Sequence, residues 1–279
     1  MNRLELIEGL KVFLAEDLGS GDLTSESIFV DAQTGKACFI ARAAFVCAGM
    51  GTVAGEVFRL CNPCIEYTAI DDGTRVQAGD VLFTASGPVI DLLRAERVAL
   101  NLVQRLSGIA TLTSRFVDKV MLLPVKIVDT RKTTPGLRML EKYAVRVGGG
   151  HNHRFNLADG ILIKDNHIAA CGGSIQKAVN RVRERTPHTL KIEVEAETLE
   201  QVEACLAADV DIIMLDNMSP ELMRQAVRLV KGRALLEASG GINLENVRAV
   251  AETGVNLISI GALTHSAPAC DISMEMETL

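Results

Sequence analysis

A regular alternation of strand-like and helix-like segments over residues 125–263 constrains the fold of this 279-residue chain more than any other feature. Six short apolar runs fit buried strands, and a segment with helical spacing separates each run from the next. Such alternation predicts parallel strands joined by right-handed crossovers. The six runs are VKIVDT (125–130), ILIK (161–164), LKIEVEA (190–196), DIIMLDN (211–217), ALLEAS (234–239) and LISIGAL (257–263).

Such a sheet can close in two ways, as an open doubly wound sheet or as an α/β barrel. No Gly-x-Gly-x-x-Gly follows the first strand, and polar residues end nearly every strand instead of meeting at one switch point, which favours a barrel. Six strands are two fewer than the roughly eight of a complete barrel. We therefore expect an incomplete, open α/β barrel of about six to seven parallel strands.

The first hundred residues follow a different pattern. Residues 4–18 have helical apolar spacing, whereas residues 36–49 and 64–89 are rich in β-branched and aromatic residues and contain Asp-Gly and Ala-Gly-Asp turns, as in antiparallel strands. A long helical pattern over residues 92–121, with Gly108 as a candidate interruption, marks the domain junction. The predicted parts are an N-terminal domain (1–105), a barrel domain (106–265) and a tail (266–279) that returns to the first domain.

Composition excludes several classes of protein. Apolar residues make up 48% and charged residues 23%, as in globular proteins, while aromatic residues make up only 4%, which disfavours base-stacking nucleic-acid binding. No apolar run is long enough to span a membrane, and the N-terminal residues lack a signal-peptide pattern. Seven cysteines without framework spacing fit reduced thiols in a cytoplasm, and Cys61 and Cys64 have no second pair to complete a zinc site.

Residues 129–168 contain a local excess of positive charge. They hold seven basic side chains against four acidic ones, and three of the five histidines, in a chain with a formal net charge of −6. Nucleic-acid binders spread basic charge over a whole face, so this excess indicates a pocket for a small, strongly anionic ligand. Within the stretch, Thr134 as N-cap and Pro135 predict a helix that runs to Val147, followed by a glycine loop over 148–150.

Candidate site residues follow each predicted strand, where barrel enzymes place their active sites. Glu193 and Glu195 share one face of their strand, as do Glu237 and Ser239, and inward carboxylates need a cation or a polar partner. Glu195 and Asp216, at the ends of consecutive strands, suggest a Mg²⁺ or hydroxyl site, or else ion pairs with lysines. The candidates are Arg131, Lys132, Lys164, Glu195, Asp216, Ser239, Gly240, Gly241 and Gly261.

The last two strands end in ASGGI and SIGAL, each followed by the start of a helix. Late barrel loops and helix N-termini commonly form phosphate cradles, although a packing or turn role would also explain these glycines. His151, His153 and His167 are not spaced as zinc ligands. His153, beside Arg154, is interpreted as a donor to an anionic substrate and His167 as a structural support. Lys164 could be a Schiff-base nucleophile, but the nearby arginines favour charge binding.

Long motifs of the chain resemble those of the quinolinate phosphoribosyltransferase family. The motifs are DTRKTTPGLRMLEKYAVRVGGGHNHRFNLADGILIKDNHI, KIEVEAET, IIMLDN, EASGGI and ISIGALTH, with AEDLGSGDLTS and ERVALNLVQRLSGIAT before them. The resemblance covers nearly the whole chain. It implies an N-terminal α/β sandwich domain, a C-terminal incomplete α/β barrel, and a homodimer or higher assembly in which the neighbour's N-terminal domain completes the active site.

The resemblance also implies roles for residues at matching motif positions. Arg97 would reach the neighbour's site. Thr130, Arg131, Lys132, His153, Arg154 and Lys164 would surround the quinolinate carboxylates and phosphoribosyl pyrophosphate. Glu195 and Asp216 would bind the ribose hydroxyls and Mg²⁺, with Lys132, Lys164, Glu195 and Asp216 as the catalytic set. Ser239, Gly240, Gly241 and Gly261 would hold the 5′-phosphate.

Three alternatives remain open on the sequence alone. The first is a Schiff-base lyase that depends on Lys164. The second is a molybdenum-transport-linked paralogue with the same fold, and the third is a phosphosugar-binding protein without catalysis. The expected partners are the two small substrates and copies of the chain itself, with no nucleic acid and no membrane.

Overall fold

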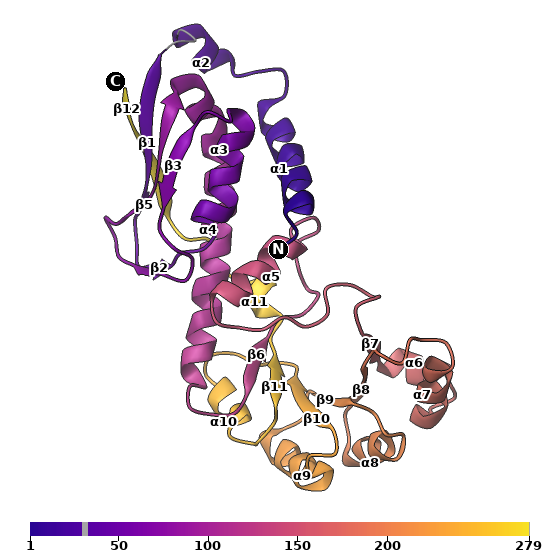
Figure 1. Cartoon of the computed structure of the whole chain (residues 1–279). Helices are drawn as coiled ribbons and strands as arrows, with labels where there is room; N and C mark the ends of the chain where they lie inside the picture. The colour runs from indigo at the N-terminus through magenta and orange to yellow at the C-terminus, as the bar shows by residue number, and fades with distance from the viewer. Residues whose placement is uncertain (30–32, 279) are drawn as a thin grey trace. The chain divides into compact units, whose positions relative to one another are not determined.

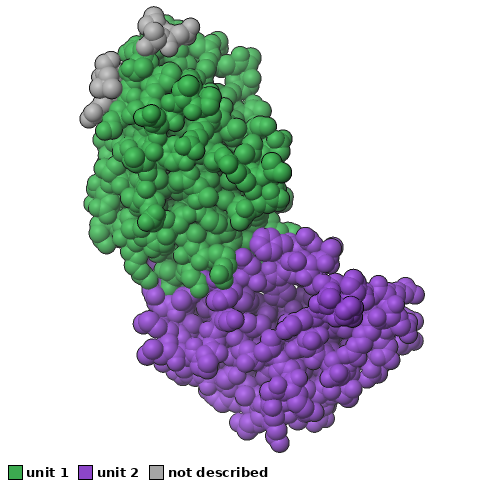
Figure 2. Space-filling view, viewed as in Figure 1, with its two compact units in different colours: residues 1–114, 134–149, 266–279 green, residues 115–133, 150–265 purple. Residues whose placement is uncertain are grey.

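The structure is a computed structural model that describes residues 1–29 and 33–278, and it contains two compact units (Figures 1 and 2). The helix α4 (Val89–Lys119) has residues in both units. Unit 1 comprises Met1–Ser114, Thr134–Gly149 and Ser266–Leu279, and unit 2 comprises Arg115–Thr133 and Gly150–His265. Residues 134–149 thus belong to unit 1 by their contacts, although the sequence analysis placed them in the barrel domain.

Unit 1 is built on an antiparallel sheet with the strand order β12-β1-β5-β3. These strands are β12 (Ile272–Thr278), β1 (Thr34–Ala41), β5 (Val81–Pro88) and β3 (Glu66–Ala69), and β2 (Phe45–Val46) pairs with β4 (Arg75–Val76). The other helices are α1 (Arg3–Leu18), α2 (Leu23–Ile28), the π-helix η1 (Met50–Ala54), α3 (Gly55–Cys61) and α5 (Arg138–Val147). No helix or strand was expected from the sequence at the position of α3.

The core of unit 1 lies on one face of this sheet. Alternate residues of β1 are buried, including Phe39, because successive side chains of a strand point to opposite faces. The ring of Phe39 lies 5.8 Å from that of Phe58 in α3 and 5.2 Å from that of Phe83 in β5. Three aromatic rings therefore join the helix to two strands.

The C-terminal segment of unit 1 passes close to α4. The backbone N–H of Cys270 donates to the carbonyl of Gln104 (2.9 Å), and the Gln104 amide donates to the carbonyl of Ile272 (2.7 Å). A Cβ at Gly108 would collide with the carbonyl oxygen of Pro268. Gly108 therefore does not interrupt the helix, which is continuous there; it gives the returning chain room to pass.

Replacing Gly108 by alanine is expected to destabilise the protein by about 1–3 kcal/mol, because the new methyl group must displace main chain. Gly9→Ala is the matched control: Gly9 is also helical, but a Cβ there meets no atom within 4 Å. That variant should gain about 0.5–1 kcal/mol from helix propensity. Urea unfolding of both variants measures the difference, and equal stabilities would contradict this packing argument.

Unit 2 contains six parallel strands in the order β6-β11-β10-β9-β8-β7. They are β6 (Lys126–Val128), β7 (Ile161–Ile163), β8 (Ile192–Ala196), β9 (Ile212–Asp216), β10 (Leu235–Ser239) and β11 (Leu257–Ser259). Among the described residues, β6 and β7 do not pair, and His151 forms a parallel bridge to Val128 of β6. The predicted incomplete, open α/β barrel is confirmed.

Short polar residues start the crossover helices of unit 2. Ser174, Thr198 and Ser219 each accept a hydrogen bond from the backbone N–H three residues later, which satisfies an otherwise unpaired donor of the first turn. Pro220 follows the last of these caps, at a position where its missing N–H costs nothing. The helices are α6 (Asp165–Ala170), α7 (Ile175–Arg183), α8 (Leu199–Ala207), α9 (Pro220–Val230), α10 (Val247–Ala251) and α11 (Ala262–His265).

The predicted start of α5 was wrong. Thr134 is not its N-cap; the helix begins at Arg138 and Leu137 occupies the cap position. Gly136 has a φ of 81°, which no α-helix accommodates, so residues 134–137 form a turn instead. The backbone N–H of Thr134 donates to the side chain of Glu141 (3.2 Å), which satisfies it without a helical partner.

Within the described part of the chain, no helix is long and apolar enough to cross a membrane. The seven cysteines are free thiols. Burial, together with the nearby Asp91 carboxylate, raises the pKa of the Cys61 thiol to about 11, which makes it a poor nucleophile and metal ligand.

Candidate active site

A cavity of about 840 Å³ opens at the carboxyl ends of the strands of unit 2, and residues in or directly after all six strands line it. Side chains two positions apart on a strand share a face, and pairs of this kind at the strand ends line the cavity, among them Leu162 and Lys164, Met214 and Asp216, and Glu237 and Ser239. The predicted site residues that line it are Thr130, Arg131, Lys132, His153, Arg154, Lys164, Glu195, Asp216, Ser239, Gly240, Gly241 and Gly261.

Arg97 is the one predicted site residue that does not line this cavity. It belongs to unit 1, its side chain is 57% exposed, and its guanidinium lies 3.6 Å from the carboxylate of Glu96. An exposed ion pair of this length contributes little energy, so the Arg97 guanidinium can exchange Glu96 for another anion at little cost.

Two basic side chains of the cavity, Lys164 and Arg154, are held by protein groups. Lys164 Nζ donates to Glu195 (2.6 Å), so the ion pair that the sequence left as an alternative for Glu195 is formed. Arg154 donates to the carbonyl of Gly160 (2.7 Å). Burial, and then the like charge of Arg131, lower the pKa of Arg154, because both disfavour the charged guanidinium. An anion bound between Arg131 and Arg154 would relieve this repulsion.

Glycines of the last two strand ends also line the cavity. Gly240 and Gly241 have φ values of 95° and 62°, a conformation that other residues rarely adopt. A Cβ at Gly240 would collide with the side chain of Asn217, and one at Gly261 would lie 2.9 Å from the side chain of Lys132. Nothing lies within 4 Å of a Cβ placed at Gly241. The backbone there can approach an anion closely.

The segment that carries His153 and Arg154 is fixed by Asp129, which is fully buried at the end of β6. Its carboxylate accepts hydrogen bonds from the backbone N–H of His153 (2.8 Å) and from the side chain of Asn152 (2.6 Å). The backbone of His151 pairs with the edge of β6. These contacts hold an irregular segment in one place without a helix or a strand.

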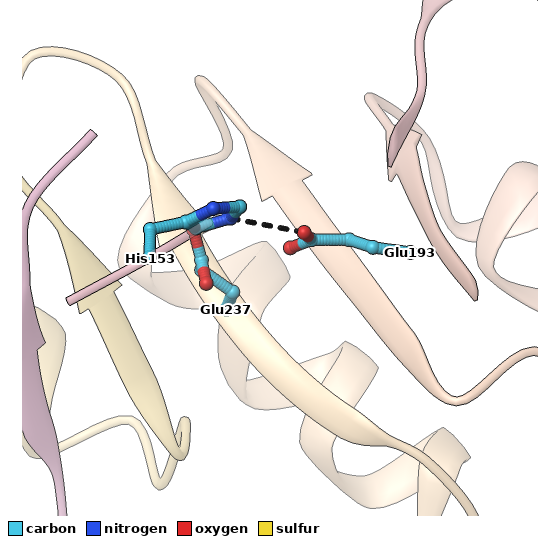
Figure 3. Close-up of side chains that lie close together, drawn as sticks. All are labelled: His153, Glu193 and Glu237. Carbon is cyan, nitrogen blue, oxygen red and sulfur yellow. Dashed lines mark hydrogen bonds and ion pairs between the residues drawn. The ribbon is translucent and has the colours of Figure 1, made fainter. Parts of the chain in front are cut away.

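His153 and Glu237, which line the cavity, form a cluster with the buried Glu193 (Figure 3). His153 Nε2 lies 3.0 Å from a carboxylate oxygen of Glu193 and 3.7 Å from one of Glu237. Both glutamates are buried, and one oxygen of each has no hydrogen-bond partner among the described residues. Burial and the neighbouring Glu193 raise the pKa of Glu237 to about 7, while His153 partly offsets this.

Several features of the site escaped the sequence analysis. Asp129 was counted only as a charge, and Asn217 and His265, which line the cavity, were not considered. Asp129 lay near the carboxyl end of the predicted strand 125–130, and this position was a usable signal because the other candidates also lie at strand ends. His167, interpreted as a structural support, accepts the backbone N–H of Lys164 through Nδ1 (2.9 Å), which confirms that interpretation.

Glu237→Gln is expected to stabilise the protein more at pH 8 than at pH 5. The folded-state pKa of about 7 exceeds the ordinary value of 4.5, so the folded chain binds more protons in this window and its stability falls as pH rises through it. Glutamine removes this loss, which amounts to about 1–3 kcal/mol. The groups that face Glu237 are Glu193, His153, Ser259 and Asp129.

Urea unfolding at both pH values measures this effect, with the exposed Glu203→Gln as control. A gain that does not depend on pH would show that Glu237 does not titrate between the two values.

An open α/β barrel with a cation-lined cavity and a glycine cradle at its carboxyl edge defines the class of phosphate- and carboxylate-binding barrel enzymes. Comparison with known families is more specific. Residues 22–107 match the quinolinate phosphoribosyl transferase N-terminal domain, and residues 109–275 match the C-terminal domain of the same family. The chain belongs to the quinolinate phosphoribosyltransferase family.

Individual relatives agree with this assignment. The chain is 50% identical to the probable nicotinate-nucleotide pyrophosphorylase (carboxylating) of Bacillus subtilis, over 99% of this chain and 95% of the relative. It is 39% identical to a mitochondrial quinolinate phosphoribosyltransferase (decarboxylating) of Nicotiana tabacum, over 98% and 83% of the two chains. The crystal structure of NadC from Streptococcus pyogenes superposes with a TM-score of 0.96 at 44% identity, covering 100% and 99%.

Proposed function

We propose that this protein transfers the phosphoribosyl group of phosphoribosyl pyrophosphate to quinolinate with decarboxylation. The products are nicotinate mononucleotide, pyrophosphate and CO₂, and the step belongs to de novo NAD biosynthesis. The observation that carries the proposal is the single cavity in which Arg131, Lys132, Arg154 and Lys164 face two strand-end carboxylates and a glycine cradle. Membership of the family supports the same reaction.

The charges of the substrates match this cavity. Quinolinate has two carboxylates, and the second substrate has a 5′-phosphate and a pyrophosphate, so several fixed cations are needed. We assign Arg131 and Arg154 to the quinolinate carboxylates, since a guanidinium binds such a group through two hydrogen bonds. Lys132 and Lys164, with Thr130 and His153 beside them, complete the binding of the two anions.

The glycines and strand-end carboxylates of the cavity suit the phosphoribosyl group. Ser239, Gly240, Gly241 and Gly261 are assigned to the 5′-phosphate, because exposed backbone N–H groups of such loops bind phosphate oxygens. Glu195 and Asp216 are assigned to the ribose hydroxyls and to Mg²⁺, a hard ion that prefers carboxylate and substrate oxygens. When bound, Mg²⁺ would neutralise charge on the pyrophosphate leaving group.

The residues of the site account for both steps of the reaction. Glu195 and Asp216 near the ribose stabilise the positive charge that develops at the anomeric carbon as pyrophosphate leaves and the ring nitrogen attacks. The ring nitrogen is then quaternary, and its positive charge stabilises the electron pair that remains on the adjacent ring carbon when the carboxylate departs as CO₂. That carbon then takes up a proton from water, which gives nicotinate mononucleotide. Decarboxylation therefore needs no organic cofactor. The ion pair of Lys164 with Glu195 favours charge binding over a Schiff-base role.

We further propose that the protein acts as a homodimer or a higher assembly, in which Arg97 of one chain binds substrate in the cavity of another. The exposure of Arg97 in unit 1 leaves it available for this role. A cytoplasmic location is proposed on the basis of the seven free cysteines.

The direct test mixes the protein with Mg²⁺, phosphoribosyl pyrophosphate and quinolinate and detects nicotinate mononucleotide by chromatography. We expect product with all components, and none with a chelator in excess of Mg²⁺. A molybdenum-transport-linked paralogue would not turn quinolinate over, and a phosphosugar-binding protein would release no pyrophosphate. Borohydride trapping with substrate should leave no adduct on Lys164; an adduct would support the lyase alternative.

As a variant in the same assay, Arg131→Ala should raise the KM for quinolinate about tenfold or more, the effect of losing a charged hydrogen-bond partner. Arg228→Ala, on the exposed surface of α9, is the matched control and should leave both Michaelis constants unchanged. An unchanged KM for quinolinate in Arg131→Ala would show that Arg131 does not bind this substrate.

Mixing two inactive variants tests the sharing of sites. Arg97→Ala and Lys132→Ala should each be nearly inactive, while hybrids formed by refolding them together should regain activity, because each hybrid dimer contains one site with both residues intact. Random pairing restores about a quarter of the sites. Activity of the mixture no greater than the sum of the two variants would refute a role for Arg97 in the neighbour's cavity.

A further inference from the structure

Both ring nitrogens of His153 contact the protein itself. Nδ1 accepts the backbone N–H of Arg154 (2.8 Å), and Nε2 lies 3.0 Å from Oε2 of Glu193 (Figure 3). A ring nitrogen that accepts an N–H has no proton of its own, so the ring proton lies on Nε2 and is donated to Glu193. The surroundings thus select the Nε2–H tautomer.

We propose that Glu193 is a positioning residue: it fixes the His153 ring and, through Nδ1, the main chain that carries Arg154 into the cavity. The inference rests on the proposed function, in which Arg154 binds a carboxylate of quinolinate. His153 acts as a spacer between a buried carboxylate and this arginine. His153 thus supports the binding of the anions by fixing Arg154, since both of its ring nitrogens contact the protein.

The segment needs such a device because it has no regular secondary structure to order it. Asp129 holds the backbone N–H of His153, and the carbonyl of Gly160 holds the Arg154 guanidinium, but neither contact reaches the main-chain N–H of Arg154. The His153 ring makes that contact. A bidentate grip on a carboxylate tolerates displacements of only a fraction of an ångström, so each fixed point matters for binding.

The cluster could instead hold a divalent cation. One ligand atom each of His153, Glu193 and Glu237 lie within 4.8 Å of one another, and this donor set suits several metals. A metal ion, however, would need an unprotonated Nε2, whereas the hydrogen bond at Nδ1 places the proton there. The geometry therefore favours the positioning role. The first experiment below also tests for metal binding.

The first experiment reads the tautomer directly. The full chain with ¹⁵N-labelled histidine is studied by NMR, and His153→Gln assigns the signal among the five histidines. We expect a neutral ring protonated at Nε2 in the free protein. A ring protonated at Nδ1 would overturn the proposal, as would binding of added Zn²⁺ or Mn²⁺ that is lost in His153→Gln.

The second experiment separates positioning from a general structural effect. Glu193→Leu removes the acceptor and should raise the KM for quinolinate about tenfold or more, with the KM for phosphoribosyl pyrophosphate within about twofold of the wild type. Glu193→Gln keeps an acceptor oxygen and should recover most of the loss. An unchanged KM for quinolinate, an equal rise in both constants, or no recovery with glutamine would overturn the proposal.

The exposed Glu203→Leu is the matched control for a leucine replacement and should behave as the wild type. If Glu193→Leu does not fold, the KM for quinolinate of Glu193→Gln and the tautomer of the His153 ring decide the question. A wild-type protein that forms no nicotinate mononucleotide would refute the proposed function, whereas the tautomer of His153 would still decide whether Glu193 holds the ring.

Discussion

The parallel register of six strands is the constraint on which the site depends. Parallel strands end at one edge of the sheet, and every second side chain points to the same face. Residues more than a hundred positions apart in sequence, such as Thr130 and Gly261, are thereby brought to one cavity without any local motif to join them. The crossover helices, started by Ser174, Thr198 and Ser219, return the chain so that each strand runs in the same direction.

The site combines cations that line the cavity with buried carboxylates. Asp129 and Glu193 are buried and contact His153, which lines the cavity, whereas Glu237 is buried and lines the cavity itself. A buried carboxylate is costly unless it accepts hydrogen bonds, and Asp129 and Glu193 accept theirs from the segment that carries His153 and Arg154. The buried negative charge thus holds the positive charge in place. Glu193 and Glu237 each keep one oxygen without a hydrogen-bond partner among the described residues, and burial raises the pKa of Glu237.

Sequence predicted the fold and most of the cavity because both follow from periodicity. Strand positions, the open barrel and the strand-end residues Lys164, Glu195 and Asp216 could all be derived from alternating segments. The α5 start was missed because Thr134 and Pro135 fit a helix cap, while Gly136, at a positive φ, prevents one. The contact of His153 with Glu193 joins residues forty positions apart in sequence. A local sequence pattern contains no information on such a pair. On the sequence alone, Glu193 and Glu237 were recognised only as inward carboxylates that need a cation or a polar partner.

The central claim is that one cavity couples phosphoribosyl transfer to loss of a carboxylate. Quinolinate labelled with ¹³C in the carboxyl group next to the ring nitrogen tests it most directly. Labelled CO₂ and pyrophosphate should appear in a one-to-one ratio, and none of the label should be released when phosphoribosyl pyrophosphate is omitted. Release of labelled CO₂ without phosphoribosyl pyrophosphate, or of pyrophosphate without CO₂, would contradict the account.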